Sequence, residues 1–94
     1  MTQAIWKGEI LAESDACIRV EGNAYFPPDA IKKNYLTASD TTTVCSWKGT
    51  AHYYNIEVNG KSNPDAAWFY PEPKPAAAEI QNYVAFWKGV EIRE

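Results

Sequence analysis

The chain has 94 residues and a mass of 10.6 kDa, the size of one domain over residues 1–94 with a small hydrophobic core. Charged residues make up 22% of the chain, with five Gly and six Pro, so the composition excludes a collagen-like, low-complexity or highly charged disordered protein. The formal net charge is −3 and the nine Lys and Arg residues are spread along the chain, so we expect neither nucleic acid nor a membrane as a partner.

The first quarter of the chain predicts short strands joined by polar turns. The expected strands are Gly8–Ala12, Cys17–Val20 and Ala24–Phe26. The turns between them are Ser14-Asp15 and Glu21-Gly22-Asn23, whose residue types favour reversal of the chain.

A short helix is expected after the third strand. Pro27-Pro28 stops the strand and suits the first turn of a helix. Ile31, Tyr35 and Leu36 would then fall on one side of that helix. Thr37–Asp40 is expected to be a loop.

The centre of the chain carries the clearest β signal. Thr41–Trp47 is rich in Thr and Val, and Thr50–Val58 alternates apolar and polar residues near its end. Asn59-Gly60 follows, and both residues tolerate the positive φ of a type I′ hairpin turn. Ala66–Tyr70 is expected to be the returning strand.

This turn sets the expected register of the hairpin. The extrapolated pairs are Val58 with Lys61, Ala51 with Trp68, and Gly49 with Tyr70. Pro64 cannot donate a ladder hydrogen bond, so it must lie at an edge or a bulge.

The last quarter predicts a connector, a helix and a strand. Pro71–Pro75 is a stiff connector, Ala76–Asn82 a second short helix, and Tyr83–Ile92 one long strand. Together these elements predict a mainly β fold, a compact antiparallel sheet or barrel-like single domain with two short helices. Strands and helices do not alternate, so a doubly wound parallel sheet is not expected.

The tripeptide Trp-Lys-Gly occurs three times, beginning at Trp6, Trp47 and Trp87. Near-equal spacing raises the question of an internal repeat. Residues that flank the first and third copies match in part, whereas those around the second do not. We therefore interpret the recurrence as coincidence rather than repetition.

Four blocks of the sequence carry a family resemblance. They are Cys45-Ser46-Trp47-Lys48-Gly49 followed by Ala51 and Tyr53, Ala67-Trp68-Phe69-Tyr70-Pro71, Glu21-Gly22-Asn23 with Tyr25-Phe26-Pro27, and Tyr83-Val84-Ala85-Phe86. As a set they resemble the family called domain of unknown function 427, whose pattern has Pro where this chain has Ser46. The resemblance implies a compact β domain of this length.

Members of that family are sometimes labelled nucleotidyltransferases. Such enzymes normally hold Mg²⁺ with paired carboxylates and often cradle phosphate in a Gly-rich loop. The chain has no Asp-x-Asp or Asp-x-Glu spacing and no Gly-x-x-x-x-Gly-Lys followed by Ser or Thr. Its motifs therefore do not support that activity.

The leading hypothesis is a small-molecule site made of aromatic rings and one lysine. Four Trp, six Tyr and three Phe are more rings than a core of this size needs to bury. The predicted hairpin brings four rings toward Lys48, namely Trp47, Tyr53, Trp68 and Tyr70, and Tyr25 would add a further wall. A concave apolar site with one polar anchor commonly binds small molecules. The alternative interpretation is that the rings fill the core and Lys48 is a solvated turn residue.

A second hypothesis is an enzyme that uses Cys45 or Lys48. A nucleophilic cysteine needs a base or a helix N-terminus nearby, and the one histidine, His52, is seven residues from Cys45. A buried, inert thiol is the simpler interpretation of Cys45.

Cysteine content also bears on metal and location. Cys17 and Cys45 are too few for a disulfide-rich secreted domain, and with His52 they cannot complete a four-ligand zinc site. No apolar stretch suits a transmembrane helix or a signal peptide. We therefore expect reduced thiols, no metal, no cofactor and a cytoplasmic location.

A third hypothesis is an interaction module. Small β domains leave strand edges and aromatic patches that pair with other chains. The sequence is compatible with a monomer or a homodimer.

Overall fold

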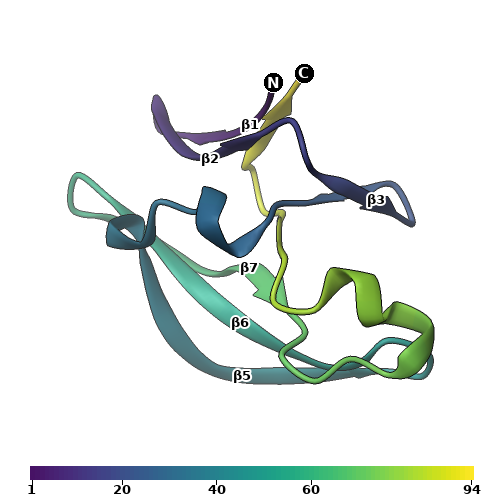
Figure 1. Cartoon of the computed structure of the whole chain (residues 1–94). Helices are drawn as coiled ribbons and strands as arrows, with labels where there is room; N and C mark the ends of the chain where they lie inside the picture. Colours follow the sequence, from purple (N-terminus) through teal and green to yellow (C-terminus); the bar gives the residue numbers. More distant parts are fainter.

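Nine strands in three antiparallel sheets make up the computed structural model, which describes residues 1–94 (Figure 1). The strands are β1 (Thr2–Trp6), β2 (Glu9–Ser14), β3 (Ile18–Val20), β4 (Asn23–Tyr25), β5 (Leu36–Cys45), β6 (Gly49–Val58), β7 (Lys61–Phe69), β8 (Val84–Phe86) and β9 (Glu91–Arg93). Three 3₁₀ segments complete the fold, namely η1 (Pro28–Ala30), η2 (Lys33–Tyr35) and η3 (Pro75–Ile80). The mainly β, antiparallel prediction is confirmed.

The largest sheet has the order β5-β6-β7-β8. Its long strands β6 and β7 are joined by Asn59-Gly60, whose φ angles of 49° and 78° are those of a type I′ turn. Val58 pairs with Lys61, as the turn predicts. The hairpin and its turn are therefore confirmed.

The expected register fails at the middle of that hairpin. Ile56 pairs with Asn63, whereas Tyr54 pairs with Ala67, so β7 contains two more residues than β6 between these pairs. The irregular segment contains Pro64, which has no N–H to donate to the β-ladder. Asp65, the next residue, takes a positive φ of 55°, and its N–H donates to Asn55 Oδ1 at 3.0 Å.

The register shift changes which residues face Trp68. Tyr53, not Ala51, lies opposite Trp68, and β7 ends at Phe69, so the expected pair of Gly49 with Tyr70 is wrong. A shift of two residues keeps every side chain on its expected face, because strand side chains alternate with a period of two. Trp68 therefore stays on the face that the hairpin predicts.

Neither predicted helix is an α-helix, and both regions form 3₁₀ turns instead. The first is two 3₁₀ turns, η1 and η2, because Ile31 bridges Ala12 in extended conformation and the Lys32 N–H donates to Leu11 O at 2.8 Å. The second is η3, which is interrupted by non-helical angles at Ala77. No helix of the structure is long and apolar enough to cross a membrane.

Two other segments differ from expectation. Thr37–Asp40 is part of β5 rather than a loop, although the β5–β6 pairing breaks between Ala38 and Thr42. The expected long strand Tyr83–Ile92 is divided into β8 and β9 by a turn in which Lys88 and Gly89 have φ of 54° and 86°. The division is needed because β8 pairs with β7 while β9 pairs with β1 in another sheet.

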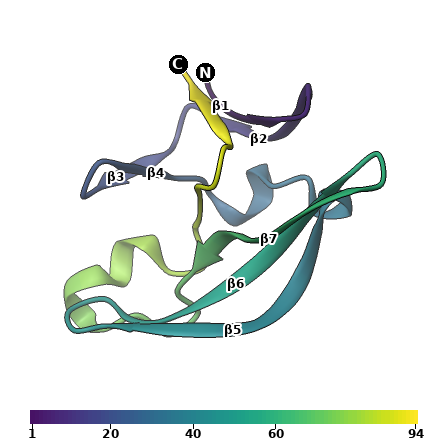
Figure 2. The same cartoon turned by 180° about the vertical axis from the view of Figure 1, so that it is seen from behind.

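The sheets are stacked rather than closed into a barrel. The β2-β1-β9 sheet holds both termini at one end, and the β5–β7 strands curve beneath it (Figures 1 and 2). The β3-β4 ribbon is joined to the large sheet through Phe26 and Val84, whose backbones exchange hydrogen bonds of 2.8 and 2.9 Å. The barrel-like form of the prediction is therefore not found.

Two core clusters divide the interior. One contains Phe26, Ile56 and Phe86, and the other contains Tyr25 and Ile80. Tyr25 and Phe26 are adjacent and fully buried, and they enter different clusters because successive side chains of an extended chain point in opposite directions. The end of β4 thus separates the two halves of the core.

Truncation of Phe26 tests this packing. Phe26 is fully buried and contacts the Phe86 ring edge-on at 5.7 Å between centroids. Phe26→Ala should cost about 3–5 kcal/mol of unfolding free energy, a large part of the total for a small domain. Urea denaturation should show this loss, whereas Val44→Ala, at a position that is 80% exposed, should change stability little. A similar loss in both variants would contradict the assignment of Phe26 to the core.

Candidate functional site

A pocket of about 220 Å³ opens beside the second core cluster. It is lined by Asn23, Tyr25, Lys48, Tyr53, Trp68, Tyr70 and Trp87. We call it the Lys48 pocket. Of the five residues predicted to bind a ligand, Tyr25, Lys48, Trp68 and Tyr70 line it, and Trp47 does not.

The loop between β5 and β6 turns Lys48 inward. Cys45 pairs with Gly49, which leaves three residues in the loop, and Gly49 has a φ of 114° that favours glycine. The connector after β7 packs on this loop, because a Cβ on Gly49 would lie 3.4 Å from Glu72 O. Lys74 ties the two together, since its N–H donates to Lys48 O at 2.9 Å and its ammonium to Ser46 O at 2.8 Å.

Lys48 is the one charged residue of the protein that is buried, with 7% of its surface exposed. Its ammonium forms a hydrogen-bonded ion pair with Glu21, in the turn before β4. It also lies 5.0 Å from the centre of the Trp47 ring and 5.9 Å from that of Tyr70. The alternative of a solvated turn lysine does not hold, and Trp47 contacts Lys48 without lining the pocket.

Local charges stabilise this ion pair. Burial favours the uncharged amine of Lys48, but the hydrogen bond to Glu21, with Tyr25 and Cys45 nearby, raises the pKa of Lys48 above its ordinary value. The same hydrogen bond lowers the pKa of the Glu21 carboxyl. Both groups are therefore charged at neutral pH.

Aromatic rings form the walls of the pocket. The Trp68 Nε1–H donates to the Tyr25 hydroxyl at 3.1 Å. The Trp68 ring also packs edge-on against the rings of Tyr25 and Trp87, with 6.2 and 5.9 Å between ring centroids. Burial raises the pKa of both Tyr25 and Tyr70, so their hydroxyls stay protonated and able to donate. Trp87 is 46% exposed and held by its Nε1–H, which donates to Asp65 O at 2.6 Å.

Cys45 lies next to the pocket, and no histidine is placed to deprotonate its thiol. It packs against the second core cluster, and the backbone N–H groups of Trp47 and Lys48 lower the pKa of its thiol. His52 is one strand away but faces the opposite side of the sheet, where its ring lies 5.9 Å from that of Phe69. No group of three or more His, Cys, Asp or Glu side chains is placed to hold a metal ion.

The three Trp-Lys-Gly copies differ in structure. In the first and third copies the lysine and the glycine both have a positive φ. In the middle copy Gly49 has a positive φ and Lys48 does not. In all three the lysine ammonium lies 5.0–5.5 Å from the ring of its own Trp. Only the middle copy directs its lysine into the interior.

Sequence reasoning missed three members of this site, namely Glu21, Asn23 and Trp87. Glu21 and Asn23 have only the signature of a turn, and no spacing in the chain connects Glu21 to Lys48. Tyr53, which the hairpin is expected to bring to this cluster of rings, lines the pocket and lies opposite Trp68. Trp87 was assigned to a continuous strand, and its turn brings it to the pocket.

A family model described as domain of unknown function (DUF427) matches residues 1–93. The chain belongs to this family. No curated protein sequence matches the chain significantly. The four blocks that resemble the DUF427 pattern supply every residue of the Lys48 pocket except Trp87.

The ion pair predicts how stability depends on pH. The pKa of Glu21 is lowered by folding, so its contribution is present above the ordinary glutamate pKa of about 4.3 and is lost as the pH falls through the lower folded value. Glu21→Gln should therefore lower the urea midpoint at pH near 7 and have a smaller effect at pH near 3. The control is Glu57→Gln, at an exposed position of β6 without an ion pair. An effect of Glu21→Gln that does not change with pH would contradict the pairing.

Proposed function

We propose that this DUF427 domain binds a small, flat, uncharged polar molecule in the Lys48 pocket. The observation that carries the proposal is a lysine with only 7% of its surface exposed, at a pocket whose other walls are mostly aromatic. Small-molecule sites commonly combine apolar walls with a few fixed polar groups in this way.

Size and charge narrow the ligand class. A volume of about 220 Å³ is below the usual range of about 300–1,000 Å³ for ligand pockets, so it suits one or two fused rings rather than a nucleotide. Glu21 already compensates the charge of Lys48, so an anion gains little there. The Lys48 ammonium and the Tyr25 hydroxyl can both donate, so the ligand should carry a carbonyl or a ring nitrogen.

Benzamide is the first probe, with benzoate as its charged counterpart. Benzamide should shift the indole N–H signals of Trp68 and Trp87 in a ¹⁵N-labelled sample, with a Kd of about 1 mM for so small a ligand. Trp6 lies in another sheet and serves as the internal control. Lys48→Met should abolish the shifts, whereas Lys7→Met, in the first Trp-Lys-Gly copy, should leave them unchanged.

Two results would contradict this proposal. One is the absence of indole shifts with a panel of uncharged one- and two-ring amides and heterocycles. The other is binding that Lys48→Met leaves intact while the variant remains folded by its amide spectrum. Trp87→Ala adds a second test, because this exposed ring can be removed with little effect on the core and should still weaken binding.

Thiol chemistry at Cys45 is the second candidate function. The backbone N–H groups of Trp47 and Lys48 lower the pKa of Cys45, whereas burial raises the pKa of Cys17. Iodoacetamide at neutral pH should therefore alkylate Cys45 before Cys17, and Lys48→Met should slow the reaction. Peptide mass spectrometry over time measures both rates in one sample. Equal rates, or faster reaction of Cys17, would remove this candidate.

A further inference from the structure

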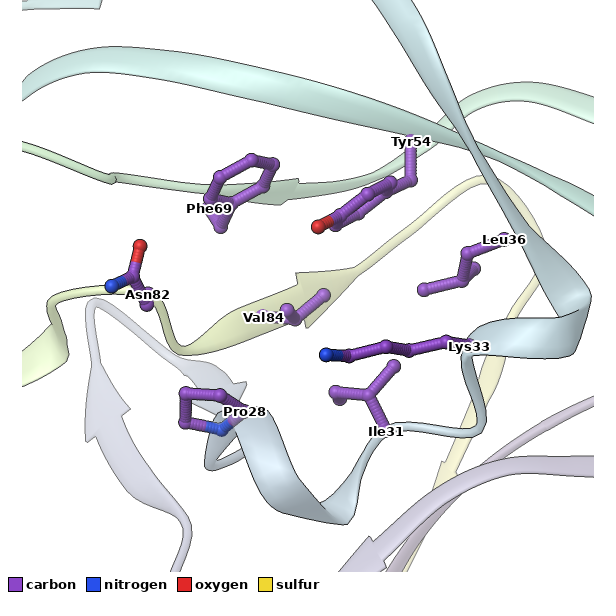
Figure 3. Close-up of a pocket in the computed structure, with 8 residues that line it drawn as sticks. All are labelled: Pro28, Ile31, Lys33, Leu36, Tyr54, Phe69, Asn82 and Val84. Atoms are coloured by element: carbon purple, nitrogen blue, oxygen red, sulfur yellow. The ribbon is translucent and has the colours of Figure 1, made fainter.

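The larger cavity of the protein lies on the opposite face of the large sheet and is independent of the Lys48 pocket. Its volume is about 460 Å³, within the usual range for small-molecule sites. It is lined by Pro28, Ile31, Lys33, Leu36, Tyr54, Phe69, Asn82 and Val84 (Figure 3). We call it the Lys33 cavity, and it shares no residue with the Lys48 pocket.

The body of the Lys33 cavity is apolar. Tyr54 and Phe69 stack at 4.8 Å between centroids with an interplanar angle of 20°. Pro28 and Ile31 lie across the cavity from this ring pair, with Val84 between them (Figure 3). The gap between rings on one side and aliphatic groups on the other suits a flat apolar molecule.

A cation without a partner extends into this apolar space. The Lys33 side chain lies over Ile31 and places its ammonium near the middle of the cavity (Figure 3). None of the ion pairs or side-chain hydrogen bonds of the structure involves Lys33. The Tyr54 hydroxyl points toward the same space, and it too lacks a hydrogen-bond partner. The polar side chains that line this cavity are Lys33, Tyr54 and Asn82, which can all donate a hydrogen bond, and no acidic side chain lines it.

We propose that the Lys33 cavity binds an organic carboxylate with a flat apolar body, such as an aromatic acid of two rings. The carboxylate would accept hydrogen bonds from the Lys33 ammonium and the Tyr54 hydroxyl, and the rings would lie between the Tyr54–Phe69 pair and the aliphatic wall. Charge complementarity selects this class, because Lys33 is uncompensated whereas Lys48 is paired with Glu21. The two cavities thus have opposite charge preferences.

The test uses 2-naphthoate and its uncharged counterpart 2-naphthamide. In methyl-labelled protein, 2-naphthoate should shift the Ile31, Leu36 and Val84 signals and leave Val44, on the exposed part of β5, unchanged. Lys33→Met keeps the length of the side chain and removes its charge, and should weaken binding by about tenfold or more, the effect of a lost charge-assisted hydrogen bond. The control Lys32→Met removes a neighbouring charge that does not line the cavity, and should leave the affinity within about twofold.

Any of three results would overturn the proposal. These are no methyl shifts at saturating 2-naphthoate, equal affinity for 2-naphthamide, or equal loss of affinity in the Lys32→Met and Lys33→Met variants. Equal affinity for the amide would mean an apolar cavity without selectivity for acids. Lys33 is exposed and lies on a 3₁₀ turn, so Lys33→Met should fold, and the methyl spectrum without ligand verifies this.

Discussion

The irregular pairing at Pro64-Asp65 is the constraint on which the geometry of the Lys48 pocket depends. Asp65 links β7 to two other strands, because its carboxylate accepts hydrogen bonds from the Ser39 and Thr41 hydroxyls of β5 and its N–H donates to Asn55 of β6. Its carbonyl oxygen accepts the indole N–H of Trp87. These bonds fix the two-residue shift that places Tyr53 opposite Trp68, and they hold Trp87 at the mouth of the pocket.

The two lysines that line pockets, Lys48 and Lys33, have different surroundings. Lys48 is buried, paired with Glu21 and held by a loop that the connector after β7 covers. Lys33 is exposed and has no acidic partner, and its side chain reaches over the apolar Ile31 (Figure 3). A buried pair presents little net charge to a ligand, whereas a free ammonium in apolar surroundings favours an anion. The two pockets on opposite faces of the large sheet therefore differ in the charge that they present.

Local signals predicted the parts of the fold that local chemistry determines. Asn59-Gly60 specifies its turn, and the alternation in β6 specifies which face each side chain takes, so the sequence predicts that Trp68 and Tyr70 lie near Lys48, and all three line one pocket. The register could not be predicted, since it depends on the hydrogen bonds that Asp65 accepts from β5 and donates to β6. The partnership of Glu21 with Lys48 was also hidden, because it joins residues 27 positions apart through tertiary structure alone.

The break in the β5–β6 pairing has a consequence for the outer edge of the large sheet. β5 has ten residues and no neighbour on its outer side, and a regular strand of that length would offer a continuous template for another chain. Between Ala38 and Thr42 the ladder is interrupted, and hydroxyls of this segment are drawn inward to Asp65. The outer edge of β5 is therefore divided into two short stretches. A strand of another molecule that paired in register with one stretch would be out of register with the other, which disfavours the growth of fibrils through this edge.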